Sequence, residues 1–236
     1  MAHHIDSVKY ERYLGSLNEK DAQYVRTIVD NLIYISTKEL VEMVRRSVRK
    51  FTATHDKYNL YVPGDKIGSE HYLMLQLKDE LHPVSVVKGL ERITNEYPLL
   101  ILDDAIYSSV NMCSIIDNYR YHTGYQNKLY IAVGILSTTK VDLLSHFDFN
   151  VKVIADRICD DLLPASLFPD YDWKYFYEAF GCETDCVIPI YFEHKIANAF
   201  GTYPFIQDIT AIPISRHCIN VITQQDIDTF ITEIVC

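Results

Sequence analysis

The sequence has neither an excess of basic residues nor a long apolar run. Its 22 Lys and Arg residues stand against 32 Asp and Glu, which gives a formal net charge of -10. A nucleic-acid binder needs positive charge to neutralise phosphates, so no nucleic-acid partner is expected. No window approaches the roughly 18 consecutive apolar residues of a membrane span, so no membrane partner is expected either.

The cysteines form no disulfide framework. Six of them are scattered at positions 113, 159, 182, 186, 218 and 236, and the first residues lack the apolar segment of a signal peptide. This pattern predicts free thiols and a cytoplasmic location. The spacing of Cys182 and Cys186 to His194 fits no zinc-binding pattern, so no dedicated metal site is expected.

Apolar runs alternate with segments of helical periodicity, which predicts an α/β fold with a doubly wound parallel sheet. The expected strands are residues 58–62, 84–87, 99–102, 128–136, 149–154 and 187–192. Helices are expected over 25–33, 40–51 and 69–81, from about 110 through Tyr119, and from Asp172 to Phe180. We expect a single domain of 1–236, with a helical extension (1–52), a core sheet (58–155) and a C-terminal elaboration (156–236).

One strand ends in a pair of acids. Leu99–Leu102 is apolar at four consecutive positions, as in a strand covered on both faces, and Asp103 and Asp104 follow where it is expected to leave the sheet. Ligands of open α/β sheets bind at the carboxyl ends of strands. Ser108 and Ser109 then precede a predicted helix, whose N-terminal amides suit a phosphate. A sugar phosphate would use both features; a purely structural acid pair is the alternative.

Three α/β families that use such an acidic strand end do not fit this sequence. The phosphate loop of nucleoside triphosphatases is missing, because Gly64-Asp65-Lys66-Ile67-Gly68 has its residue types in the wrong order. An aspartyl phosphatase would need D-x-D instead of adjacent acids. A phospho-receiver domain would need a further Asp at a neighbouring strand end, where Ile135-Leu136-Ser137 has none.

The stretch LLILDDAIYSS (residues 99–109) resembles the ribose-phosphate motif of type I phosphoribosyltransferases. The strand at 58–62 and the loop at 64–68 fall where that family has its diphosphate loop. The segment PIYFEHKIANAFGTYPFI (189–206) is similar to a segment of phosphoribosyltransferase-like proteins, including ones encoded by large DNA viruses. The resemblance covers roughly residues 58 to 206 and implies transfer of a phosphoribosyl group from phosphoribosyl diphosphate to a nitrogen nucleophile.

The resemblance also implies roles for individual residues. Asp103 and Asp104 would accept hydrogen bonds from the ribose hydroxyls and favour an oxocarbenium-like transition state. Lys66 and Gly68 would meet the diphosphate together with Mg²⁺, which the ligand's own oxygens would largely hold. The 5-phosphate would be bound by the loop Tyr107, Ser108, Ser109 and Val110. Lys195 would lie near phosphate or base, although a surface ion pair within Glu193-His194-Lys195 is the alternative.

The phosphate loop departs from the family pattern. Members usually have Thr in place of Tyr107, Gly in place of Ser109, and Thr or Ser in place of Val110. Two further hypotheses therefore stay open: a catalytically inactive module that binds a nucleotide or sugar phosphate, and an interaction protein. A homodimer is expected from the resemblance alone, and the sequence does not identify the acceptor.

Overall fold

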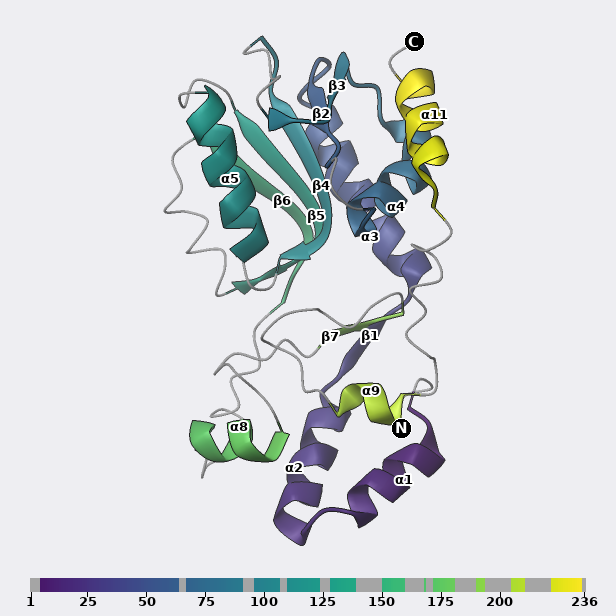
Figure 1. Cartoon of the computed structure of the whole chain (residues 1–236), viewed down its shortest axis with the longest axis vertical. Helices are drawn as coiled ribbons and strands as arrows, with labels where there is room; N and C mark the ends of the chain where they lie inside the picture. The colour runs from purple at the N-terminus through teal and green to yellow at the C-terminus, as the bar shows by residue number, and fades with distance from the viewer. Residues whose placement is uncertain are drawn as a thin grey trace. The chain divides into compact units, whose positions relative to one another are not determined.

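The structure is a computed structural model that describes residues 5–63, 67–90, 96–106, 110–123, 128–138, 150–159, 168, 172–180, 190–193, 205–210 and 222–234. Figure 1 shows the elements with their labels. They are α1 (Ser7–Gly15), α2 (Glu19–Asp30), β1 (Ile33–Ile35), α3 (Thr37–Thr52), β2 (Asn59–Tyr61), α4 (Ser69–Gln76), a 3-10 turn (Lys78–Glu80), β3 (Ser85–Val87), β4 (Leu99–Ile106), α5 (Val110–Thr123), β5 (Leu129–Ser137), β6 (Val151–Cys159), α8 (Trp173–Phe180), β7 (Ile190–Phe192), α9 (Ile206–Ile209) and α11 (Gln224–Ile234).

The chain divides into two compact units, which are described separately. One contains Met1–Thr37 and Asp160–Arg216, and we call it the N-terminal unit. The other, the sheet unit, contains Lys38–Cys159 and His217–Cys236. The boundary between the units at Thr37 falls inside the predicted helical extension (1–52), and the single domain of 1–236 stays a prediction.

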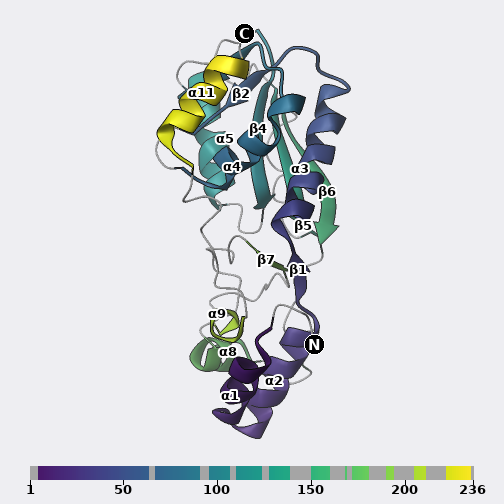
Figure 2. The same ribbon diagram turned by 90° about the vertical axis from the view of Figure 1, so that its right-hand side faces the viewer.

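The sheet unit is built on five parallel strands in the order β3-β2-β4-β5-β6. Helix α5 covers one face, where Met112 and Ile116 pack against Ile101 and Val133. Helices α3 and α4 cover the other face (Figure 2). Parallel strands with helices on both faces confirm the predicted α/β, doubly wound core.

The two central strands are buried along nearly their whole length, as their apolar sequences predict. All nine residues of β5 are buried, and in β4 only Asp103 is partly exposed. Strand β4 continues past Leu102 to Ile106, because Asp103, Ala105 and Ile106 pair in register with β5. The prediction that the strand ends before the acids was therefore wrong.

Helix α3 is held on the edge strand by a charged pair. The guanidinium of Arg46 donates to both carboxylate oxygens of Asp156 on β6, at 2.8 Å and 2.7 Å. These bonds hold the pKa of Asp156 below its ordinary value of 3.8. A carboxylate with a depressed folded-state pKa stabilises the fold above its unfolded pKa, and this stability is lost as the pH falls through the folded value.

We expect Arg46→Gln to raise the pKa of Asp156 toward its ordinary value. The variant should be less stable than the wild type at neutral pH, and the difference should shrink as the pH falls below about 4. An NMR titration of the carboxyl carbons measures this shift. Asp228, whose pKa the side chain of Lys88 lowers, is the internal control and should not change. An unchanged Asp156 titration would contradict the assignment.

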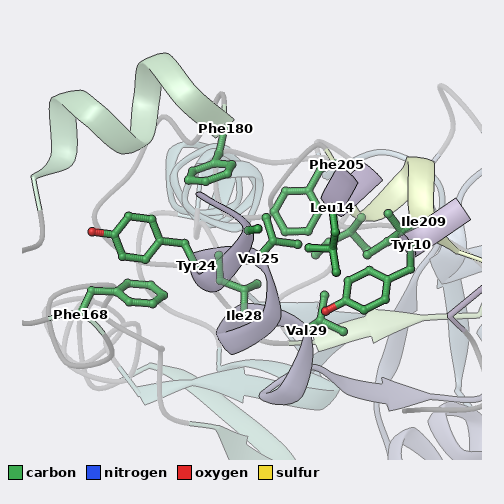
Figure 3. Close-up of a cluster of buried hydrophobic side chains, with 12 residues drawn as sticks. Tyr10, Leu14, Tyr24, Val25, Ile28, Val29, Phe168, Phe180, Phe205 and Ile209 are labelled. Atoms are coloured by element: carbon green, nitrogen blue, oxygen red, sulfur yellow. The ribbon is translucent and has the colours of Figure 1, made fainter. Parts of the chain in front are cut away.

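The N-terminal unit has its own aromatic core. The ring of Tyr24 lies between those of Phe168, at 4.5 Å, and Phe180, at 6.5 Å (Figure 3). Tyr13 stacks on Phe205 with the ring centroids 5.4 Å apart. Phe168, α8 and α9 of the predicted C-terminal elaboration thus pack with α1 and α2, whereas its first residues, 156–159, belong to β6.

Strands β1 and β7 form a two-stranded parallel sheet, in which Ile33 pairs with Ile190 and Ile35 with Phe192. The prediction of a helix through Ile33 was therefore wrong at that end, because α2 already ends at Asp30. The predicted strand 187–192 is present at Ile190–Phe192. Helix α11 of the sheet unit was not predicted; it contacts α4, and its Asp228 pairs with Lys88 at 2.8 Å.

Candidate functional site

The strand order creates a topological switch point between β2 and β4. From β2 the chain crosses to β3 on one side, and from β3 it returns to β4 on the other side of β2. The chain therefore leaves β2 and β4 toward opposite sides of the sheet, and ligands of doubly wound sheets typically bind at such a switch point. The two loops that the sequence singles out, after residues 62 and 106, follow these two strands.

The acid pair lies within β4, so its two side chains point to opposite faces of the sheet. Asp103 pairs with Val133, which belongs to the apolar cluster under α5. Asp104 lies next to Gly134, where an added Cβ would meet Leu40 and Val44 of α3. Asp103 is therefore on the α5 face and Asp104 on the α3 face.

The two carboxylates also differ in exposure. Asp104 is 1% exposed, and its Oδ1 accepts the N–H of Ala105 at 2.7 Å. Asp103 is partly exposed, and its Oδ1 accepts the N–H of Asp104 at 2.8 Å. Of the two residues, Asp103 is the more exposed and therefore the better candidate for contact with a ligand.

The loop between β2 and α4 is fastened at both ends by one side chain that the sequence analysis missed. His71 is 2% exposed, and its Nδ1 accepts the N–H of Gly68 at 3.1 Å. Nε2 then carries the proton and donates to the carbonyl of Pro63 at 2.9 Å. The sequence does contain a signal for this contact, because His71 stands three residues after the N-cap Gly68, in the position that Glu or Gln takes in a capping box. Ser69 is the first helical residue, as the predicted start of this helix requires.

Several predicted site residues lie outside the described residues: Lys66, Tyr107, Ser108, Ser109 and Lys195. Val110 is the first residue of α5, whose N-terminus follows the carboxyl end of β4. Gly68 lies on the connection after β2 and Val110 follows the connection after β4, whereas Asp103 lies within β4, three residues before its end. Their predicted roles stay predictions.

Glu193, from the segment Glu193-His194-Lys195, caps a helix. Its Oε2 accepts the N–H of Thr37, the first residue of α3, at 2.8 Å. Its own N–H donates to the carbonyl of Ile35 at 3.0 Å, which continues the pairing of β1 and β7. The hydrogen bond between Glu193 and Thr37 joins residues 156 positions apart. Among the described residues, Glu193 forms no ion pair.

We expect Glu193→Ala to lower the free energy of unfolding by about 1 kcal/mol, because the first turn of α3 loses both an acceptor and a negative charge. Glu193→Gln keeps an acceptor oxygen and should lose less than half of that. Urea unfolding of the full chain measures both values. Equal stability of Glu193→Ala and the wild type would rule out the capping role.

The described residues contain no group of three or more His, Cys, Asp and Glu side chains that could hold a metal ion. Cys113 is a free thiol, as predicted. Among the helices that the structure describes, none has the length and apolar character to cross a membrane.

Among solved structures, the chain is similar to one described as a hypoxanthine-guanine-xanthine phosphoribosyltransferase. The identity is 11% and the TM-score 0.33, over 51% of this chain and 74% of that one. No family model and no curated protein matches the sequence. The fold is therefore assigned from the sheet itself, whose parallel strands with flanking helices form the predicted α/β core.

Proposed function

We propose that the chain binds a phosphoribosyl or nucleotide ligand at the switch point between β2 and β4. The observation that carries this proposal is the position of Asp103. It is the one partly exposed residue of an otherwise buried central strand, and it lies toward the carboxyl end of that strand. A carboxylate accepts hydrogen bonds only, which suits the hydroxyl groups of a sugar.

The reaction that we propose for this site is phosphoribosyl transfer. A nitrogen nucleophile attacks C1 of phosphoribosyl diphosphate, the C1–O bond breaks, diphosphate leaves with the bonding electrons, and the nitrogen gives up a proton. Asp103 would accept from a ribose hydroxyl and stabilise the positive charge that develops on the sugar. Asp104, whose Oδ1 accepts the N–H of Ala105, would hold the strand backbone beside Asp103 in place.

The remaining predicted contacts hold the two ends of the substrate. The 5-phosphate would meet the loop Tyr107 to Ser109 and the N-terminus of α5 at Val110. The diphosphate would meet Lys66 and the first turn of α4 after Gly68. Lys195, which was predicted near the phosphate or the base, lies outside the described residues, and this role stays a prediction.

Mg²⁺ fits the donor chemistry of this edge, because it prefers oxygen ligands and keeps several waters, and Asp103 is a partly exposed carboxylate. When bound, the ion would neutralise charge on the diphosphate. No cage of protein ligands is needed for this, since the substrate supplies most of the oxygens.

A binding module without turnover is the second candidate, and a specific observation favours it. The N–H of Gly68, which the resemblance assigns to the diphosphate, is already bound to His71. The departures at Tyr107, Ser109 and Val110 point the same way. In either case the partner is a small molecule, and a homodimer stays a prediction.

Release of diphosphate separates the two candidates. The full chain is incubated with phosphoribosyl diphosphate, Mg²⁺ and a panel of purine and pyrimidine bases. Transfer predicts base-dependent diphosphate release that Asp103→Asn reduces. Binding without release supports the module, and neither binding nor release contradicts both.

A further inference from the structure

Strand β6 forms one edge of the five-stranded sheet. It pairs with β5 on one side, and among the described residues no strand lies on its other side. Edge strands of natural proteins are usually short, bulged or interrupted by proline, which prevents them from pairing with a second chain. Strand β6 has none of these protections. It is nine residues long, contains no proline, and keeps one register with β5 from Val151 to Cys159.

The odd-numbered residues of β6 direct their backbone groups to this free edge. Successive residues of a strand turn their N–H and C=O groups alternately to its two sides. The carbonyl of Asn150 accepts the N–H of Leu129 at 2.7 Å, so the even-numbered residues bond to β5. The carbonyl of Ala155 instead accepts from Nζ of Lys50, an exposed side chain of α3, at 3.3 Å. The residues that present backbone groups to a further strand are therefore Val151, Val153, Ala155 and Arg157.

We propose that the β6 strands of two copies of this chain pair antiparallel about a two-fold axis, so that one continuous sheet runs through a homodimer. A two-fold interface brings the same surface of both copies together, so the strand has to complement itself. With Ile154 opposite Ile154 of the second copy, Lys152 lies opposite Asp156 of the second copy, and this charged pair occurs twice. The outward-facing residues then meet as hydrogen-bonded pairs, Val153 with Ala155 and Val151 with Arg157.

The charges of β6 select this register over its neighbours. Lys152 and Asp156 are four residues apart and thus on the same face of the strand, and Lys152 is exposed. Opposite charges directly across two antiparallel strands stabilise the pairing, and like charges destabilise it. With Val153 or Ala155 on the two-fold axis, Lys152 would lie opposite an isoleucine. With Lys152 or Asp156 on the axis, two like charges would meet.

The same register gives a partner to an exposed apolar side chain. Ile158 on β6 is 60% exposed. In the dimer it lies diagonally across from Lys152 of the second copy, whose aliphatic stem can cover it. The interface is separate from the candidate ligand site, because β5 lies between β6 and β4. The proposal therefore does not depend on the proposed function.

Sedimentation equilibrium of the full chain measures the dissociation constant of the dimer. Lys152→Glu sets a like charge opposite Asp156 at both ends of the interface, so it should weaken the dimer about tenfold. Lys57→Glu is the matched control, because it makes the same change of charge at an exposed residue before β2, on the other side of β4 from β6. Its dissociation constant should stay within about twofold of the wild type at physiological salt.

Hydrogen exchange over a range of protein concentrations shows whether β6 is the surface that pairs. The amides of Ile154 and Asp156 face β5 and should be protected at every concentration. The outward amides of Val153, Ala155 and Arg157 should become protected only as the dimer forms. A chain that stays monomeric, outward amides whose exchange does not change with dimer formation, or equal weakening by Lys152→Glu and Lys57→Glu would overturn the proposal.

Discussion

Replacing Gly134 with alanine is expected to lower the free energy of unfolding of the sheet unit by about 1–3 kcal/mol, the usual cost of overpacking a tight core. A Cβ at this position would lie 2.8 Å from Cδ1 of Leu40 and 3.1 Å from the carbonyl oxygen of Asp104. The leucine tip can rotate, but the carbonyl belongs to the central strand β4. Relief therefore requires α3 or the β4–β5 pairing to shift.

Hydrogen exchange of the β5 amides measures this loss within the sheet unit. The only tryptophan of the chain, Trp173, lies in α8 of the N-terminal unit, so its fluorescence follows the other unit and should be unchanged. Separate probes are needed because two compact units need not unfold in one transition.

Gly15→Ala is the matched control for this substitution. Gly15 is the last residue of α1, and a Cβ there meets nothing within 4 Å. The same chemical change should be neutral or stabilise by up to about 1 kcal/mol, because alanine narrows the unfolded ensemble. A Gly134→Ala variant as stable as the wild type would contradict the close packing of α3 on β5.

The central strands could be predicted from sequence because their signal is local. Continuous apolar runs at 99–102 and 129–136 mark strands covered on both faces, and both are buried in the sheet. The end of β4 could not be predicted in this way. Its last residues are held by in-register pairing with β5, and the length of a partner strand leaves no mark on the sequence around Asp103.

Three features were not predicted from the sequence: strand β1, helix α1 and the cap that Glu193 forms on α3. Strand β1 has three residues, and its partner β7 begins at Ile190, so no periodicity identifies it. Helix α1 had a usable signal, since the side chain of Asp6 caps it through the N–H groups of Val8 and Lys9. The cap that Glu193 forms on Thr37 depends on the fold alone.

The candidate site was predicted in outline and refined in detail. The loops after 62 and 106 were selected by residue type, and the strand order places their strands on either side of a switch point. The same role was predicted for Asp103 and Asp104 from the sequence, whereas their side chains point to opposite faces of the sheet because both lie in β4. The contact of His71 with Gly68 was missed because histidine is an unusual partner at that capping position.

The central claim is that the carboxylate of Asp103 accepts a hydrogen bond from a sugar hydroxyl. Replacing Asp103 is therefore expected to cause a large loss of affinity for the ligand. Hydrogen bonds to a charged group contribute about 1.5–3 kcal/mol, so Asp103→Asn should bind phosphoribosyl diphosphate roughly 10- to 150-fold more weakly. Asp117→Asn is the control, because Asp117 on α5 is 68% exposed in its side chain and lies 3.9 Å from Arg120. Its affinity should equal that of the wild type.

Calorimetry of the full chain with phosphoribosyl diphosphate and Mg²⁺ is the most direct test of this claim. The account predicts saturable heat in the wild type and in Asp117→Asn, and a loss of at least about tenfold in affinity in Asp103→Asn. No heat in the wild type, or equal affinity in Asp103→Asn, would contradict it.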